Sequence, residues 1–97
     1  MMCDYVETLE KAVEVFGERI QSEIAIEEMA ELTKEIVKNF RGNDNVQNII
    51  EEIADVQIML DQLKIMFDCQ VEVQWSMEEK IERLNNRINK VAIKKES

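Results

Sequence analysis

Acidic side chains gather in two short stretches of the chain, and they are the residues best suited to chemistry. The first stretch holds four glutamates, at positions 27, 28, 31 and 35, and the second holds Glu51, Glu52 and Asp55. Carboxylate oxygens are the ligands that magnesium prefers. The two stretches can therefore supply a magnesium site if the fold brings them together.

Histidine is absent from the sequence, and this narrows the chemistry. Its absence excludes Ser-His-Asp and Cys-His triads, zinc sites with histidine, and the Glu-x-x-His arms of di-iron bundles. Carboxylates that hold magnesium fit displacement at phosphorus. The metal neutralises phosphate oxygens and lowers the pKa of a bound water, and a spare carboxylate can orient or deprotonate that water.

The composition predicts one all-helical domain spanning residues 1–97. There is no proline and there are only two glycines, which favours long uninterrupted helices. The net charge of −9 argues against unaided binding to nucleic acid or to an anionic membrane, because both need lysine and arginine. A phosphate ligand can still bind if a metal cation bridges it to the acidic side chains.

Localisation is predicted from what the chain lacks. No apolar run approaches ~18 residues, and the N-terminus has no basic-then-apolar signal. Cys3 and Cys69 form neither a metal motif nor a disulfide framework, so we expect free thiols in a reducing compartment. These features together predict a cytoplasmic protein.

Apolar residues recur at helical spacing in four segments, which predict four helices. The segments cover residues 6–16, 25–40, 46–67 and 77–91. Gly17 falls where the first helix would end. Residues 41–45 are typical of a short turn, which makes the second and third helices antiparallel neighbours. The fourth helix can start near Val71 or at Ser76, where a capping box begins.

The third segment is apolar on more than one side, so we expect it to be buried from more than one side. A chain of 97 residues cannot supply both walls. The sequence therefore predicts an antiparallel four-helix bundle that is completed by dimerisation.

The acids lie beside the apolar stripes of their helices rather than opposite them. At 100° per residue, Glu28, Glu31 and Glu35 share one edge of the second helix, and Glu52 and Asp55 flank the stripe of the third. In an antiparallel pair these two edges lie on the same side. At least four carboxylates are then expected to line one groove.

The turn also predicts which acids are level with each other. A turn centred near positions 43 and 44 places Glu31 level with Asp55 and Glu35 level with Glu52, with Glu28 one turn away. The alternative is a solvated acidic face, since Glu-x-x-Glu pairs are common in helices. Two acidic clusters that converge, with few basic partners, favour the metal site over that face.

Basic residues that could grip phosphates lie mainly on the predicted fourth helix. Lys80, Arg83 and Arg87 recur at helical spacing there, and Lys38 follows Glu35 by one turn. A solvated basic face and an internal salt bridge at Lys38 are the alternatives. Trp75 could stack on a base, although a core or interface role is more common for tryptophan.

The paired acidic motifs resemble a known family. Glu27-Glu28-Met29-Ala30-Glu31-Leu32, followed after a turn by Glu51-Glu52-Ile53-Ala54-Asp55-Val56, is similar to the signature of MazG-like all-α nucleoside triphosphate pyrophosphohydrolases. The run 16–63 resembles their small single-domain bacterial and phage members. Lys80-Ile81-Glu82-Arg83 and Arg87 are similar to the basic pattern of the family's last helix, although Leu84 stands where many members have asparagine.

The resemblance implies a dimer, or a dimer of dimers, that hydrolyses nucleoside triphosphates to the monophosphate and pyrophosphate. It implies magnesium, with manganese as a possible substitute. The implied magnesium ligands are Glu28, Glu31, Glu52 and Asp55. Supporting catalytic roles fall to Glu27 or Glu35, and phosphate contacts to Lys38, Lys80, Arg83 and Arg87.

Two alternatives remain open from the sequence. One is a dUTPase-like or phosphoribosyl-ATP pyrophosphohydrolase variant on the same scaffold. The other is a non-catalytic helical dimerisation or interaction module whose acidic face serves solubility or a basic partner. Base and sugar preference stay open in every case.

Overall fold

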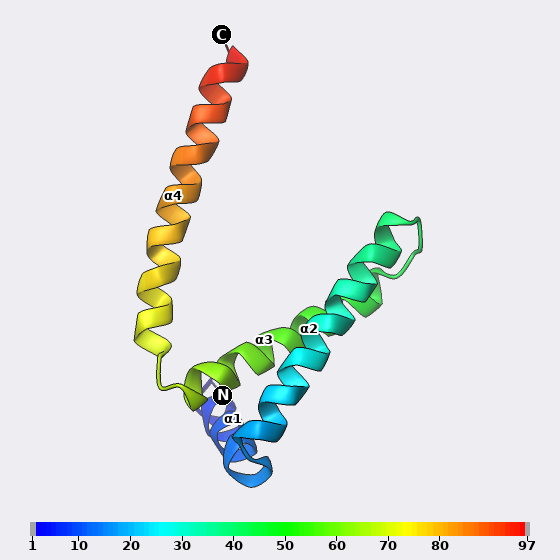
Figure 1. Ribbon diagram of the computed structural model, residues 1–97, viewed down its shortest axis with the longest axis vertical. Coiled ribbons are helices and arrows are strands. Elements are labelled where there is room, and N and C mark those ends of the chain that lie inside the picture. Colours follow the sequence, from blue (N-terminus) through cyan, green and yellow to red (C-terminus); the bar gives the residue numbers. More distant parts are fainter. Residues whose placement is uncertain (1, 97) are drawn as a thin grey trace.

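The protein is all-helical, as predicted. The computed structural model describes the backbone of residues 2–96 and the side chains of residues 5–95. It contains four helices, α1 (Met2–Phe16), α2 (Glu18–Phe40), α3 (Val46–Met66) and α4 (Gln70–Glu96), and no strand occurs in these described residues (Figure 1). The predicted four segments each correspond to one helix.

The junctions between the first three helices follow the glycines. Gly17 separates α1 from α2 with a φ of +91°, and Gly42 has a φ of +96° just after α2. Side chains disfavour such backbone angles, so glycine allows the chain to reverse there. The expected end of the first helix at Gly17 and the expected turn at residues 41–45 are both confirmed.

Helices α2 and α3 lie side by side and run in opposite directions (Figure 1). At the far end of the pair, Gln21 Nε2 donates to Gln62 Oε1 over 2.8 Å, and both side chains are buried. Near the turn, Asn45 Nδ2 donates to the backbone oxygen of Glu35 over 2.9 Å. Contacts at both ends fix the relative register of the two helices.

The core is small and lies where α1 meets the α2–α3 pair. Its buried apolar side chains are Leu9, Ala25, Val56 and Met59. Helix α1 contacts both α2 and α3, so it covers one side of their lower half. Cys69 carries a free, half-buried thiol, whereas the prediction for Cys3 falls outside the described side chains.

Helix α4 stands away from the rest of the chain, and the molecule has the shape of a V (Figure 1). Among the described residues, its backbone comes close to α3 and to no other helix. The two are joined through Asp68, which has a φ of +50°. The helix begins at Gln70, close to Val71, so Ser76 lies inside it and does not start it.

The chain is more extended than a folded monomer of its size. Its radius of gyration is 17.5 Å, whereas about 12.5 Å is typical of 97 residues. Its accessible surface is 8058 Å², whereas about 5,800 Å² is expected for a protein of this mass. One copy alone therefore leaves roughly 2,300 Å² more exposed than a compact domain would.

None of the described helices combines the length and the apolar character that a membrane span needs.

Candidate metal centre

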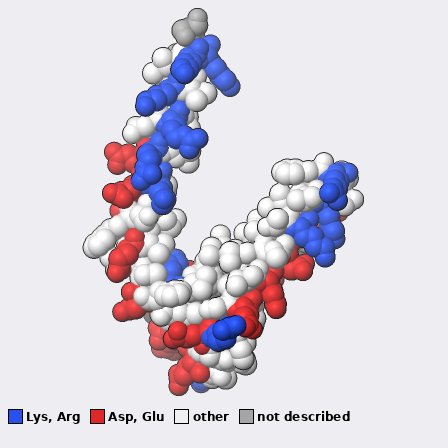
Figure 2. All heavy atoms as spheres, viewed as in Figure 1, with Lys and Arg blue, Asp and Glu red and all other residues white. Residues whose placement is uncertain are grey.

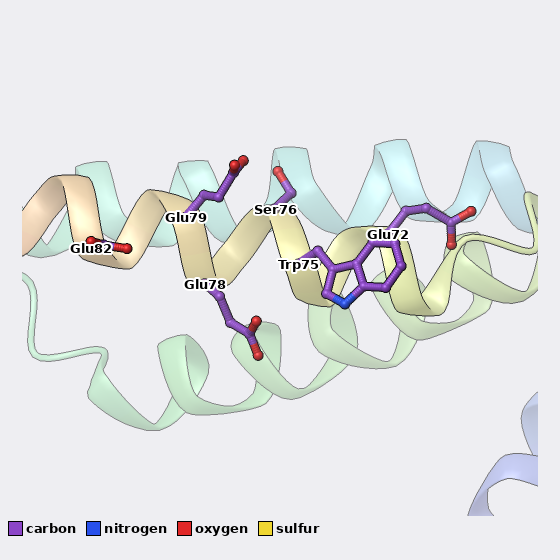
Figure 3. Close-up of a pocket in the computed structure, with 6 residues that line it drawn as sticks. All are labelled: Glu72, Trp75, Ser76, Glu78, Glu79 and Glu82. Atoms are coloured by element: carbon purple, nitrogen blue, oxygen red, sulfur yellow. The ribbon is translucent and has the colours of Figure 1, made fainter.

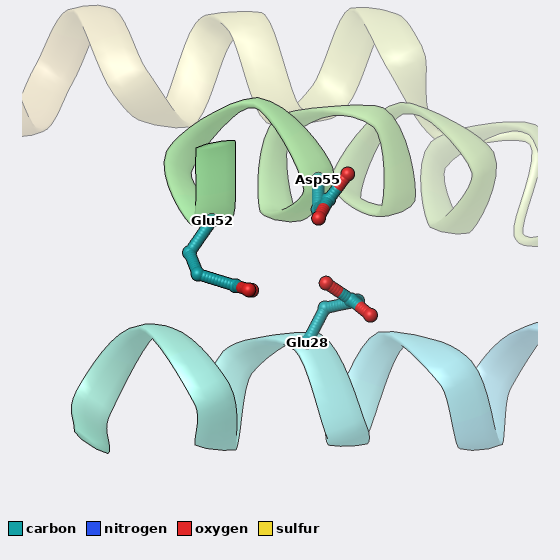
Figure 4. A group of neighbouring side chains, drawn as sticks. All are labelled: Glu28, Glu52 and Asp55. Atoms are coloured by element: carbon teal, nitrogen blue, oxygen red, sulfur yellow. The ribbon is translucent and has the colours of Figure 1, made fainter. Parts of the chain in front are cut away.

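Three predicted acids converge between α2 and α3. Glu28 comes from α2, and Glu52 and Asp55 come from α3 (Figure 4). One carboxylate oxygen of each lies within 4.8 Å of those of the other two. Since Glu52 and Asp55 are three residues apart on one helix, they present adjacent carboxylates to the glutamate opposite.

The residues of α2 and α3 that lie opposite each other differ from those predicted. Glu28 faces Asp55 and Glu52, whereas a turn centred near position 43 predicts Glu31 and Glu35 in that place. The chain turns earlier, because α2 ends at Phe40 and residues 43–45 already run back along it. Asn45 consequently bonds to Glu35, and the pairing shifts by about one helical turn.

The carboxylates of this triad (Glu28, Glu52 and Asp55) repel one another in a partly buried place. Burial raises the pKa of the Glu28 carboxyl from 4.5 to about 7, and hydrogen bonding and charge repulsion from Asp55 and then Glu52 add to the rise. A raised carboxyl pKa means that the ionised form is poorly stabilised by its surroundings. The triad therefore favours binding a proton or a cation.

Glu52 contributes a second indication of a ligand. Its Oε2 atom is buried and has no hydrogen-bond partner among the described residues. A buried oxygen without a donor is costly, because it has lost its water without replacement. A hard divalent cation would satisfy this oxygen, and the carboxylate-only donor set matches what magnesium and manganese bind.

Glu35 is engaged in the turn between α2 and α3. Its Oε1 accepts from Asn45 Nδ2 at 3.0 Å and from Asn48 Nδ2 at 3.2 Å, and its Oε2 lies 3.4 Å from Lys38 Nζ. The hydrogen bond from Asn45 lowers the pKa of Glu35 most, with Asn48 and Lys38 adding to the effect. This cluster of Glu35, Lys38, Asn45 and Asn48, termed the turn clasp below, stabilises the reversal of the chain.

The turn clasp bears on two predicted site residues. Glu35 was expected beside Glu52 in a catalytic role, and it lies buried among turn residues outside the triad's ligand set. Lys38 was expected to contact phosphate, and it forms the internal salt bridge that was the alternative. The asparagines of the clasp were not identified as partners from the sequence, although asparagine at the start of a helix is a known turn signal.

The remaining predicted acids face water. Glu27 and Glu31 are exposed on α2, and Glu51 is exposed on α3. Glu31 follows Glu28 by three residues on the same helix, so it lies one turn along from the triad. Its carboxylate is accessible but is not among the three that converge.

The predicted phosphate contacts on the last helix are not assembled with the triad in one chain. Lys80, Arg83 and Arg87 are exposed on α4. Basic side chains cluster along the outer half of α4, and acidic ones line the outside of the α2–α3 pair across the open V (Figure 2). Any contact between these groups at one site would need a movement of α4 or a second chain.

Trp75 lies on the surface of α4 with 63% of its area exposed. It borders a shallow hollow together with Glu72, Ser76, Glu78, Glu79 and Glu82 (Figure 3). Four glutamates around the ring make this hollow a poor place for a triphosphate, because like charges repel. The acidic hollow is therefore distinct from the predicted phosphate contacts.

Comparison with known proteins does not add a relative. No family model matches the chain, no curated protein matches it, and no solved structure matches it. The resemblance to the MazG-like family consequently rests on the acidic motifs and their spacing.

The raised pKa of Glu28 predicts pH-dependent metal binding. Below pH 7 the carboxyl holds a proton that a cation must displace, so Mg²⁺ affinity should rise from pH 5.5 to pH 8 by about tenfold or more. Without metal, the folded protein binds more protons than the unfolded chain between pH 4.5 and 7, so the free energy of unfolding should fall as pH rises through that window. Isothermal titration calorimetry and denaturant melts measure these two effects.

The Glu28→Gln variant is the control for this experiment. It removes the titrating group, so both pH dependences should flatten between pH 5.5 and 8 while the helical content stays the same. An Mg²⁺ affinity in the unmodified protein that is constant over this range would contradict the assignment.

The turn clasp makes a separate prediction. Glu35→Ala should lower the Tm by several degrees at pH 7, because it leaves Asn45 and Asn48 without their acceptor. The lowered pKa of Glu35 means that its contribution is present above pH 4.5 and is lost as the pH falls through its value in the folded protein. The difference in Tm should therefore shrink in acid, whereas Glu31→Ala at the exposed position nearby should change the Tm little at any pH.

Proposed function

We propose that this protein is a Mg²⁺-dependent nucleoside triphosphate pyrophosphohydrolase, releasing the monophosphate and pyrophosphate. The observation that carries the proposal is the triad, in which acids from two helices meet and one of them, Glu52, has a buried Oε2 with no hydrogen-bond partner among the described residues. A cluster needed only for solubility would point away from the helix interface. This cluster lies at the interface, where its repulsion costs stability unless a cation is bound.

Each carboxylate of the site would have a distinct task. Glu28, Glu52 and Asp55 would hold the metal, which when bound supplies charge neutralisation for phosphate oxygens. Glu31, exposed one turn along α2, would either add a further ligand or accept a proton from the attacking water. Glu27 is exposed beside them and is the second candidate for that base.

Phosphate binding would depend on positive side chains outside the triad. Lys80, Arg83 and Arg87 of α4 are exposed and unconstrained by the helix core, so they are available to a triphosphate. Lys38 would contribute only if its salt bridge with Glu35 opened. The resemblance to the MazG-like family supports the same class of substrate, with dUTPase-like or phosphoribosyl-ATP specificity as variants of one reaction.

The protein would act as a homodimer, or as a dimer of dimers, in which a second copy completes the four-helix bundle. The excess accessible surface of roughly 2,300 Å² per chain supports this, because obligate dimers bury about 2,000–5,000 Å² in total. The competing interpretation, a non-catalytic dimerisation module, is favoured by the same surface. Only the triad separates the two, so substitutions in it are the decisive test.

Neutralising one ligand should abolish hydrolysis. Asp55→Asn should reduce pyrophosphate release from a nucleoside triphosphate in Mg²⁺ by about 100-fold or more, since it removes a negative ligand from the site. Glu51→Gln makes the same charge change on the exposed side of α3 and should keep most of the activity. A screen over canonical and modified triphosphates provides the assay, and equal turnover in both variants would remove the catalytic assignment.

Light scattering tests the oligomeric state independently of activity. At micromolar concentration the chain should have at least twice its mass of 11.4 kDa, because a monomer would leave the inside of the V in water. A monodisperse monomer that still hydrolyses triphosphates would reject the dimer and leave the chemistry standing.

A further inference from the structure

The inside of the V is an apolar surface without a partner in the single chain. Three stripes contribute to it, one from each of the long helices. On α2 these are Ile26, Met29, Ile36, Val37 and Phe40; on α3 they are Val46, Ile50, Ile53, Leu60 and Phe67, just past its end; and on α4 they are Met77, Ile81, Leu84, Ile88 and Val91. All of these side chains are exposed, Phe40 by 81% and Phe67 by 74%.

The spacing of these stripes is that of helices made to pack against other helices. The stripe of α4 follows a 4-3-4-3 pattern from Met77 to Val91, and that of α3 starts with the same pattern at Val46. This repeat is the seam of a coiled coil or a four-helix bundle. An apolar stripe at this spacing is typical of a helix side that packs against another helix, and not of a side that faces water.

The stripes of α2 and α3 lie on one face of their pair. In both helices the stripe lies about 100° around the axis from the side that contacts the other helix, in the same rotational sense. Because the two helices run in opposite directions, equal rotations bring the stripes to the same face. The triad lies near the contact between the helices, away from this face, so the apolar face and the metal centre are separate surfaces.

The apolar stripes of α3 and α4 border the same groove. Leu60, Phe67 and Met77 together line a groove at the elbow of the V. The space-filling view shows the inner side of the α2–α3 arm as mainly uncharged, with acidic side chains along its outer edge (Figure 2). The two arms therefore face each other with apolar surfaces and too much space between them to touch.

The distribution of charge along the chain indicates which surface of a second copy packs between the two arms of the V. Residues 83–95 hold five lysines and arginines and no acid, whereas residues 1–82 hold 20 acids and seven basic residues. Two α4 helices side by side in parallel would bring two positive halves together, and an antiparallel α4 pair would leave the exposed apolar stripes of α2 and α3 uncovered. A positive α4 on the acidic α2–α3 pair of another copy gains attraction instead.

We propose that two copies form a reciprocal dimer, in which α4 of each lies on the apolar face of the partner's α2–α3 pair. The V of each chain then surrounds α4 of the other chain. The same contact occurs twice, once on each side of a two-fold axis, and together the two contacts bury the excess surface of both copies. The proposal deepens the dimer proposed above and does not depend on hydrolysis.

Zero-length carbodiimide cross-linking of a mixture of ¹⁴N- and ¹⁵N-labelled chains tests the arrangement, since mixed-isotope peptides identify links between chains. We expect links from Lys80 of one chain, which flanks the α4 stripe, to carboxylates of α2 or α3 in the other. Links between chains that join α4 lysines to the α4 acids Glu72, Glu78, Glu79 or Glu82 would instead show pairing of α4 with α4, and would overturn the proposal.

A matched pair of variants provides the second test. Ile88→Asp places a charge in the stripe, and should raise the dimer dissociation constant by about 100-fold or more. Ile93→Asp makes the same change on the opposite side of α4, where the side chain is 65% exposed, and should alter the constant less than about threefold. Sedimentation equilibrium gives both constants, with circular dichroism to verify helix content.

Equal dimerisation of the stripe variant and the wild-type chain would overturn the proposal. If the stripe variant lost helix, the cross-links of the unmodified protein would still decide. Neither experiment measures pyrophosphate release. A chain that forms the reciprocal dimer but has no hydrolase activity would therefore contradict only the proposed hydrolase function.

Discussion

The pairing of α2 with α3 is the constraint on which the rest of the structure depends. It creates the partly buried place where Glu28, Glu52 and Asp55 meet, and it also creates the apolar face on the other side of the pair. The pairing is held at its two ends by polar contacts, the Gln21–Gln62 hydrogen bond and the turn clasp. Both are directional, so they specify one register where apolar contacts alone would tolerate a slip of one turn.

This register places mutually repelling carboxylates at a helix interface, which is an unfavourable choice for stability alone. Burial and the neighbouring acids raise the pKa of Glu28 to about 7, so its ionised form is poorly accommodated without a counter-charge. Such local conflicts between a sequence and the stability of its fold are typical of functional sites. The metal proposed for this place would remove the conflict by supplying the missing positive charge.

The same helices that build the site leave the chain incomplete as a folded unit. Only four apolar side chains of the described residues are buried, while most of the large ones are exposed. A core of that size gives a small domain little stability of its own. A second copy that covers the inner faces of the V would supply the missing burial, and it would join folding to assembly.

Much of the fold and part of the site could be predicted from the sequence, because both depend on local pattern. Helical periodicity, the scarcity of glycine and proline and the turn residues located all four helices. The helix starts were less well determined: α2 begins at Glu18, before its apolar series, and the start of α4, left open between Val71 and Ser76, lies next to Val71. The edges on which the acids lie also follow from the 100° period alone, which is why Glu28, Glu52 and Asp55 could be named as candidates.

Tertiary structure alone decided the axial level of the two helices and the place of α4. The level depends on where the chain reverses, and it reverses about one turn earlier than predicted, so that Asn45 bonds to Glu35 and Glu28 instead of Glu31 lies opposite Asp55. The place of α4 depends on three residues around Asp68, whose backbone angles no periodicity encodes. Periodicity determines which side of a helix is apolar, but the direction of a chain between helices is determined by a few dihedral angles and by the contacts that hold them.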